Sequence, residues 1–321
     1  FPEKFDKYKI VHKGCIAFCL FDIDETPRTV GLSEFEGMLT GAYTIMKIDN
    51  VNSRFVYYYY LSLDNVKAMR PLYSGLRKTI NVGVFQGTKI PIPSSDEQDQ
   101  IVRYLDWQVS KINRLIDAKK SEIKRVVELK KAVVNEAVTH GLNPNVPMKF
   151  SGVDWLGDIP EHWETIKLRQ ILHPFSEKNH PELPLLSVVR EQGVIVRDVE
   201  NKESNHNFIP DDLSGYKMVK KGQFAMNKMK AWQGSYGISD YTGIVSPAYF
   251  IFDVDFENLE YFHYAIRSKV YVNFFAQASD GIRVGQWDLS LNKMKEIPFI
   301  VPPAEEQKAI VEYIPAAFAK Y

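Results

Sequence analysis

The chain has 321 residues, of which 45% are hydrophobic and 25% are charged, and this balance predicts a soluble globular protein with two domains. No run of about 18 apolar residues occurs, so we expect no membrane span. The only cysteines, Cys15 and Cys19, exclude a disulfide framework and favour the cytoplasm, where both would be buried free thiols. The formal net charge of zero argues mildly against nucleic acid, but residues 65–95 and 216–239 are basic stretches without any acidic residue.

The secondary structure is predicted from apolar periodicity and composition, in chain order. Residues 38–48 predict a strand, and residues 54–69 predict a helix that carries many aromatic side chains. A long helix is expected over residues 94–141. Residues 244–252, rich in β-branched and aromatic residues, predict another strand, and residues 259–275 predict another aromatic-rich helix. This mixture of helices and strands predicts an α+β fold. The chain contains a repeated unit, described below, and the first half of each copy is predicted to be mainly β.

The long helix has its own start, seam and stop signals. Ser94 and Ser95 can cap its first turn, and Glu97 and Gln98 are placed to complete a capping box. Gly141 ends it, after about 45 residues or roughly 65 Å. The apolar residues recur at alternating steps of three and four, which is typical of a coiled-coil seam that needs a partner helix. The seam residues are Leu105, Val109, Ile112, Ile116, Ile123, Val126, Val133 and Ala137.

An internal repeat divides the chain. Gly31-Leu-Ser-Glu-Phe-Glu-Gly37 reappears as Gly237-Ile-Ser-Asp-Tyr-Thr-Gly243, about 206 residues later. Further pairs keep the same order: Gly75-Leu-Arg77 with Gly281-Ile-Arg283, Ile90-Pro91 with Ile297-Pro298, and Glu97-Gln98 with Glu306-Gln307. The second copy has an opening over 154–209 that the first lacks. We therefore expect a longer parent chain, whose first unit has lost its start and is the less stable of the two.

Four segments of this repeat resemble one known family. Residues 154–163 (DWLGDIPEHW) are similar to the phrase that opens a target-recognition domain in the specificity subunits of type I restriction-modification systems. Residues 227–249 resemble the middle of that domain, and residues 297–307 resemble its closing phrase. Residues 91–98 resemble the same closing phrase at the end of a first domain. The ordered series with a long helix between is more specific than any one motif.

The resemblance implies a sequence-specific double-stranded DNA-binding subunit without an active site or cofactor. Each of two domains would read one half of a bipartite target, and two long antiparallel helices would set the spacing. Methyltransferase subunits would dock on this scaffold, and a motor-nuclease subunit would join for restriction. The implied parts are a partial first target-recognition domain (1–93), a long conserved helix (94–141), a linker (142–153), a second target-recognition domain (154–303) and the start of a second conserved helix (304–321).

The acid-free segment of the second unit is the strongest candidate for DNA contact. Lys228 and Lys230 can neutralise phosphates, and Gln233 can bond two atoms on an adenine edge. The alternative is a surface hairpin with a buried tryptophan. Arg77 and Arg283 could bind phosphate or guanine, although an internal ion pair is nearly as plausible. The candidate DNA-binding residues are Lys228, Lys230, Trp232, Gln233, Ser235, Tyr236, Arg283, Arg77 and Lys78.

The matching segment of the first unit, residues 18–28, differs in chemistry. Its Asp22, Asp24 and Glu25 would repel phosphates, although a carboxylate can accept a hydrogen bond from cytosine N4. A shared scaffold with divergent loops is expected if each unit reads a different sequence. Unconstrained drift of a loop is the competing interpretation.

Two other classes of function stay open. A metal-dependent endonuclease could use Asp253, Asp255, Glu257 and Lys269, although acids near a helix start are common. It would cleave DNA when a metal is added. A coiled-coil adaptor would show no salt-sensitive DNA binding. No Walker A sequence occurs, so ATP binding is unsupported, and no cluster of His or Cys predicts a metal site.

Overall fold

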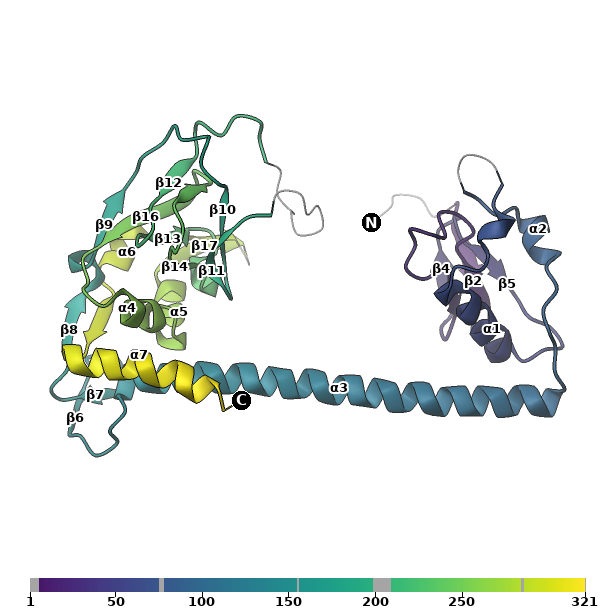
Figure 1. Cartoon of the computed structure of the whole chain (residues 1–321), viewed down its shortest axis with the longest axis horizontal. Helices are drawn as coiled ribbons and strands as arrows, with labels where there is room; N and C mark the ends of the chain where they lie inside the picture. The colour runs from purple at the N-terminus through teal and green to yellow at the C-terminus, as the bar shows by residue number, and fades with distance from the viewer. Residues whose placement is uncertain (1–5, 75–77, 155, 199–208, 284–285, 321) are drawn as a thin grey trace. The chain divides into compact units, whose positions relative to one another are not determined.

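A computed structural model of the chain contains two compact units, residues 1–120 (unit 1) and 121–321 (unit 2). Both contain helices packed with β-sheet, which confirms the expected α+β class (Figure 1). No helix in the described part of the chain is long and apolar enough to cross a membrane. The structure describes residues 6–74, 78–154, 156–198, 209–283 and 286–320, and it leaves the side chains of residues 282–286 undescribed.

Unit 1 is built on a three-stranded antiparallel sheet with β2 at its centre, between β3 and β5. A separate antiparallel pair joins β1 and β4. The strands are β1 (Lys9–Val11), β2 (Ile16–Phe18), β3 (Val30–Leu32), β4 (Gly37–Leu39) and β5 (Thr44–Met46). The helices are α1 (Ser53–Asn65), the 3-10 turn η1 (Arg70–Leu72), α2 (Val82–Gln86) and the start of α3.

The core of unit 1 lies between this sheet and α1. Asn52 starts α1 by accepting hydrogen bonds from the backbone nitrogens of Arg54 and Phe55. The helix then turns its buried side chains toward the sheet, and Phe18 of β2 lies 5.1 Å from Tyr60 and 4.7 Å from Phe85 between ring centroids. Offset and edge-on aromatic contacts of this kind add to the stability gained from burial alone.

The long helix α3 (Ser95–His140) confirms the predicted element and its limits. Ser94 Oγ accepts a hydrogen bond from Glu97 N at 3.4 Å, and Gly141 follows the last turn with a φ of +78°. A glycine is favoured there because a side chain would be strained in the left-handed conformation. Half of the seam residues are exposed to solvent, namely Val109, Ile112, Ile116 and Ile123, whereas Leu105, Val126 and Val133 are half-buried and Ala137 is buried.

Unit 2 is built on a four-stranded antiparallel sheet in the order β14-β13-β16-β9. Helices α4 and α5 pack against it around buried aromatic side chains. The strands are β6 (Met148–Phe150), β7 (Asp158–Pro160), β8 (Glu164–Lys167), β9 (Leu172–Phe175), β10 (Leu186–Val189), β11 (Gly193–Val196), β12 (Lys217–Val219), β13 (Phe224–Asn227), β14 (Tyr236–Ile238), β15 (Gly243–Val245), β16 (Tyr249–Val254), β17 (Ser279–Arg283), β18 (Gln286–Leu289) and β19 (Pro298–Val301). The helices are η2 (Leu168–Gln170), η3 (Ala231–Gln233), α4 (Leu259–Ile266), α5 (Lys269–Gln277), α6 (Leu291–Lys295) and α7 (Ala304–Phe318).

The repeat found in the sequence is also a repeat of topology. β2 lies between β3 and β5 in unit 1, as β13 lies between β14 and β16 in unit 2, and the pair β1–β4 corresponds to β12–β15. The closing motifs of the two units make the same hydrogen bond. Gln98 Nε2 donates to Pro93 O at 2.9 Å, and Gln307 Nε2 donates to Pro302 O at 2.8 Å. Each buried glutamine thereby satisfies a carbonyl just before a helix.

The structure changes the bounds of four predicted elements. Residues 38–48 form β4 and β5 with a turn at Thr40, whose carbonyl accepts from Tyr43 N, and residues 54–69 end as helix α1 at Asn65. Residues 244–252 form β15 and β16, which belong to different sheets, because Pro247 between them cannot donate to a strand ladder. The remaining segment, 259–275, is divided at Ser268 into α4 and α5.

Helix α7 lies beside the C-terminal end of α3 within unit 2 (Figure 1). An ideal Cβ on Gly141 would lie 3.8 Å from Glu306 Oε2 in the first turn of α7, and Lys130 Nζ lies 5.0 Å from the ring centroid of Phe318 at the other end. The two helices are therefore antiparallel here. At this end of α3, which α7 covers, the seam residues Val126 and Val133 are half-buried and Ala137 is buried.

Candidate nucleic-acid interface

Loop B, defined as residues 228–235, connects the central strand β13 to β14 in unit 2. Asn227 Oδ1 accepts from Met229 N at 3.1 Å, and the Trp232 indole donates to Met229 O at 3.2 Å. Gly234 closes the loop with a φ of +89°, a conformation in which a side chain would be strained. These local bonds give the acid-free segment a defined shape, with Lys230 exposed at its tip.

Loop B packs against the β17–β18 hairpin and is hydrogen-bonded to it. Trp232 and Trp287 pack with ring centroids 4.9 Å apart, and both are half-buried. Leu289 N donates to Lys228 O at 3.0 Å, and Lys228 Nζ lies 3.0 Å from the Asp288 carboxylate. Loop and hairpin therefore form one surface, although they lie about sixty residues apart in the sequence.

A basic cluster lies around Lys217 at the start of β12. Lys217 Nζ donates to Tyr249 O at 2.7 Å, and Lys178 pairs with Lys217 through an isolated β-bridge. Partial burial, together with the positive charges of Lys178 and Lys228, lowers the pKa of Lys217. Like charges held this close favour an anionic partner. Lys178 lies outside the acid-free stretch of the sequence, so no sequence signal marked it.

Arg267, between α4 and α5, fixes the neighbouring β10–β11 turn. Its guanidinium donates to Tyr236 O at 2.6 Å, Arg190 O at 3.0 Å and Glu191 O at 2.9 Å. Burial, with the positive charge of Arg267 beside it, lowers the pKa of His263 to about 4, so this imidazole is neutral near pH 7. The turn is thus held firmly against β14, the strand that follows loop B.

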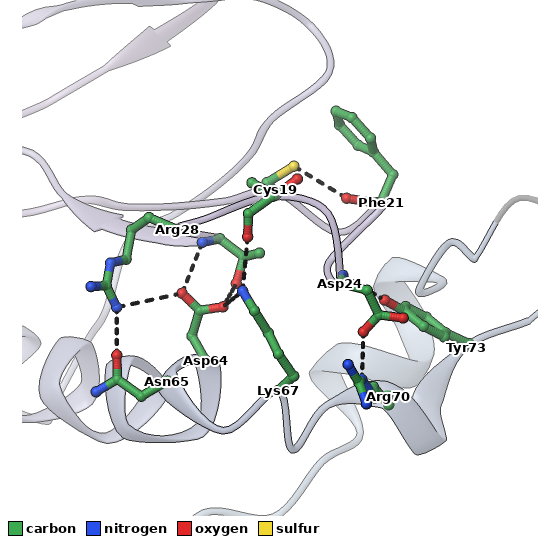
Figure 2. A network of polar contacts seen from close by, with 11 residues as sticks. Cys19, Phe21, Asp24, Arg28, Asp64, Asn65, Lys67, Arg70 and Tyr73 are labelled. Carbon is green, nitrogen blue, oxygen red and sulfur yellow. Dashed lines mark hydrogen bonds and ion pairs between the residues drawn. The ribbon is translucent and has the colours of Figure 1, made fainter. Parts of the chain in front are cut away.

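Loop A, defined as residues 19–29, is the counterpart in unit 1 and connects β2 to β3 (Figure 2). Asp64 lies fully buried beneath it and accepts hydrogen bonds from Thr29 N at 2.9 Å and Thr29 Oγ1 at 2.6 Å. Lys67 Nζ donates to the same carboxylate at 2.9 Å and to Thr26 O at 2.8 Å. Burial alone would raise the pKa of Asp64, but the hydrogen bonds from Thr29 and Lys67 outweigh it and lower that pKa.

Two acidic residues of loop A, Asp24 and Glu25, are paired with basic residues that follow α1, and Figure 2 shows the pair of Asp24 with Arg70. Arg70 Nε lies 2.5 Å from Asp24 Oδ1, and Lys78 Nζ lies 3.9 Å from Asp24 Oδ2 and from Glu25 Oε1. Asp24 N donates to the Tyr73 hydroxyl at 3.1 Å. The repulsion of phosphates expected from these acids is therefore partly neutralised inside the unit.

Strained backbone gathers around loop A. Asp22, Lys67 and Lys78 have φ angles of +45°, +52° and +47°, and only five non-glycine residues in the described part of the chain have a positive φ. Side chains rarely adopt this conformation, and such residues concentrate at functional sites. The clustering marks loop A as a candidate site, independently of its charges.

Residues 29–125 match the sequence profile of the type I restriction modification DNA specificity domain. This match runs from just before β3 in unit 1 into α3. A solved structure from a study titled "Structural basis underlying complex assembly and conformational transition of the type I R-M system" shares 12% identity and a TM-score of 0.63, covering 99% of this chain and 77% of that one. This likeness shows a common fold.

Two further solved structures are similar to this chain. They are the HsdS subunit from Thermoanaerobacter tengcongensis (13% identity, TM-score 0.44, 99% of this chain and 77% of that one) and the type I S subunit from M. genitalium (14% identity, TM-score 0.37, 99% and 80%). No curated protein matches the chain.

The structure places the residues expected to contact DNA in different surroundings. Lys230 is exposed, and Trp232, Gln233 and Lys228 are half-buried on the surface formed by loop B and the hairpin. Lys78 is exposed beside loop A. Arg77 lies outside the described residues, and so does the side chain of Arg283, whose backbone ends β17.

Two expected DNA contacts, Ser235 and Tyr236, are wrong because their side chains are buried. Tyr236 begins β14 with its side chain on the core face, where its ring lies 4.5 Å from Phe275 and 5.7 Å from Phe224 between centroids. Burial also raises the pKa of the Tyr236 phenol well above its usual value. The alternation of side chains along a strand decides this placement, and the motif did not reveal its phase.

The described residues offer few candidates for metal binding or for reactions of a thiol. No group of three His, Cys, Asp or Glu side chains in that part of the chain could hold a metal ion. Asp253, a candidate for a nuclease site, accepts a hydrogen bond from Gln223 Nε2 at 2.7 Å. Cys15 and Cys19 are buried free thiols, as expected.

Proposed function

We propose that this chain recognises a bipartite DNA sequence, with loop A and loop B as the reading elements of its two units. The observation that carries the proposal is the equivalence of the loops. Both leave the central strand of equivalent sheets, and yet one presents carboxylates and the other lysines and a glutamine. A common scaffold with different loop chemistry is what two different half-sites require.

Within loop B, the side chains of Lys230 and Gln233 suit different contacts. Lys230 is placed to neutralise a phosphate, which fixes the position of the protein but carries no sequence information. Gln233 offers the amide that can bond the N6 and N7 atoms of adenine in the major groove. The Trp232–Trp287 contact joins loop B to the β17–β18 hairpin, and Lys217 and Lys178 add further positive charge in unit 2.

The chain itself supplies no catalytic group in this proposal. Its likeness to type I specificity subunits supports methyltransferase subunits and a motor-nuclease subunit as the partners that modify and cleave DNA in the cytoplasm. The exposed seam of α3, with Ile112 and Ile116 at its centre, is the natural surface for a partner helix. Burying it would remove a row of apolar side chains from water.

The test is selection of duplexes by the purified full chain from a random library, followed by measurement of affinity against salt. We expect an enriched bipartite sequence and an affinity that falls steeply as salt rises. If no sequence is enriched and no salt-sensitive binding is seen, the chain is an adaptor and the proposal is wrong. Cleavage of DNA on addition of Mg²⁺ or Mn²⁺ would instead favour the nuclease.

A further inference from the structure

In each unit, the loop accepts a backbone hydrogen bond from a residue that lies shortly before a short helix, α2 in unit 1 and α6 in unit 2. Ile80 N donates to Leu20 O at 2.7 Å in unit 1, and Leu289 N donates to Lys228 O at 3.0 Å in unit 2. The donors occupy equivalent places in the repeat, as do the acceptors. The scaffold thus holds each loop against an equivalent element by an equivalent hydrogen bond.

Beside this shared bond, both units place an ion pair between loop and neighbouring element, but with opposite polarity. In unit 1 the carboxylate belongs to the loop, at Asp24, and its cations are Arg70 at 2.5 Å and Lys78 at 3.9 Å. In unit 2 the cation belongs to the loop, at Lys228, and the carboxylate is Asp288 of β18 at 3.0 Å. Each loop thus forms an ion pair of its own with a segment that packs beside it.

In these ion pairs, the phosphates of a polyanion can replace the carboxylate as the partner of the cation. The side chains of Arg70 and Lys78 are 61% and 51% exposed, and that of Asp288 is 56% exposed, so solvent screens the attraction. Asp24 is only 22% exposed, and its backbone is anchored to Tyr73. A DNA phosphate can therefore take the cations at modest cost, while the Asp24 carboxylate has little freedom to swing away.

We propose that Asp24 and Asp288 are specificity-determining residues that compete with DNA phosphates for Arg70, Lys78 and Lys228. This inference rests on the proposed DNA binding. A phosphate that takes one of these cations leaves a carboxylate without its partner beside a polyanion. The amino group of a cytosine or adenine can then donate to that carboxylate. DNA with such a base in place recovers the lost interaction, and other DNA does not.

The experiment compares the full chain with Asp24→Asn and Asp288→Asn, which keep side-chain size and remove the charge. The matched control is Asp49→Asn, because Asp49 also forms an exposed ion pair in unit 1, with Lys47 at 3.2 Å. Affinity is measured by fluorescence anisotropy at several salt concentrations. The duplexes are the selected one and a scrambled one of the same length and composition.

Each test variant should bind the scrambled duplex roughly threefold to tenfold more tightly at low salt, with the logarithmic salt slope steeper by about 0.9 for each phosphate gained. The selected duplex should gain less, so the specificity ratio falls. Asp49→Asn should change both duplexes slightly and equally. Adding Arg70→Gln to Asp24→Asn should abolish the gain, because the released cation is gone.

Equal gains on both duplexes, or gains no larger than those of Asp49→Asn, overturn the role of the carboxylates and leave the proposed function standing. Absence of binding to every duplex by the unaltered chain overturns the proposed function itself. Asp288→Asn lies in the other unit, so a folding defect of one variant would not remove the test. Far-UV circular dichroism of each variant identifies such a defect.

Discussion

The indole Nε1 of Trp163 donates a hydrogen bond to Glu306 Oε2 at 3.0 Å, and His162 Nε2 lies 2.5 Å from the other oxygen of the same carboxylate. Trp163 and His162 end the opening phrase of the second unit, and Glu306 lies in its closing phrase. The most recognisable motifs of the sequence thus meet each other in the framework of unit 2. Their contact explains the motifs as structural features.

Substitution of Trp163 by Ala should lower the free energy of unfolding of unit 2 by about 3–5 kcal/mol, because loss of this fully buried side chain would leave a cavity and Glu306 would lose one of its two hydrogen-bond partners. Trp107→Ala is the matched control, since Trp107 is 52% exposed on α3, and it should cost less than about 1 kcal/mol. Urea unfolding of the full chain, followed by circular dichroism, measures both. Equal losses would show that Trp163 is not a framework residue.

Substitution of Tyr236 by Phe should leave DNA binding unchanged and stabilise unit 2 by roughly 1 kcal/mol. The Tyr236 hydroxyl is buried and has no hydrogen-bond partner among the described residues. Removing an unsatisfied buried polar group removes its desolvation cost. Thermal unfolding and anisotropy on the same sample provide the measurements. A loss of affinity without a loss of stability would instead show that Tyr236 contacts DNA.

Lys230 and Gln233 should respond differently to substitution by Ala. Lys230→Ala should weaken every duplex alike and reduce the logarithmic salt slope by about 0.9, as expected for loss of one phosphate contact. Gln233→Ala should instead change sequence preference, with a cost of about 1–3 kcal/mol on the selected duplex if the amide is bidentate. Uniform losses for Gln233→Ala on all duplexes would make it a backbone contact.

The stability of unit 2 should depend on pH through His263. Its folded-state pKa of about 4 lies below the usual 6.5, so the folded state holds the neutral form and the unfolded state binds the proton more readily. Above pH 6.5 both states hold the neutral imidazole, and the free energy of unfolding is at its full value. As the pH falls from 6.5 toward 4, the unfolded state binds the proton first, so the free energy of unfolding decreases by roughly 3 kcal/mol in all. His263→Gln should flatten this dependence, whereas His173→Gln, at an exposed position, should not. Denaturant titrations between pH 4 and 7.5 test it, and an unaltered profile in His263→Gln contradicts the assignment.

The exposed seam of α3 should cause self-association of the purified chain. Ile112 and Ile116 are 56% and 44% exposed, and an apolar row of this kind stays in contact with water unless another helix covers it. Replacing both by Lys should yield a monomer in analytical ultracentrifugation. Val66→Lys is the control, since Val66 is 74% exposed but lies outside the seam, and it should not change the association. A monomeric unaltered chain over a broad concentration range would contradict the prediction.

Local chemistry was sufficient for the parts of the fold that depend on neighbours in sequence. Helix α3 begins at a serine cap and ends at Gly141, as predicted, because capping and left-handed glycine are properties of a few consecutive residues. The repeat, the α+β class and the resemblance to the specificity family also follow from residue patterns that persist along the chain. The breaks between β15 and β16 and between α4 and α5 were missed, although Pro247 was a visible local signal for the first.

Only the tertiary structure decided which residues of the loops face solvent and which charges are paired. Tyr236 lies inward because β14 packs against α5, and a short strand motif does not reveal which face is buried. The pairs Asp24–Arg70 and Lys228–Asp288 join residues separated by 46 and 60 positions, so they depend on how the chain returns. Sequence by itself therefore determined the scaffold and the kind of protein, whereas long-range packing decided the chemistry that each loop presents.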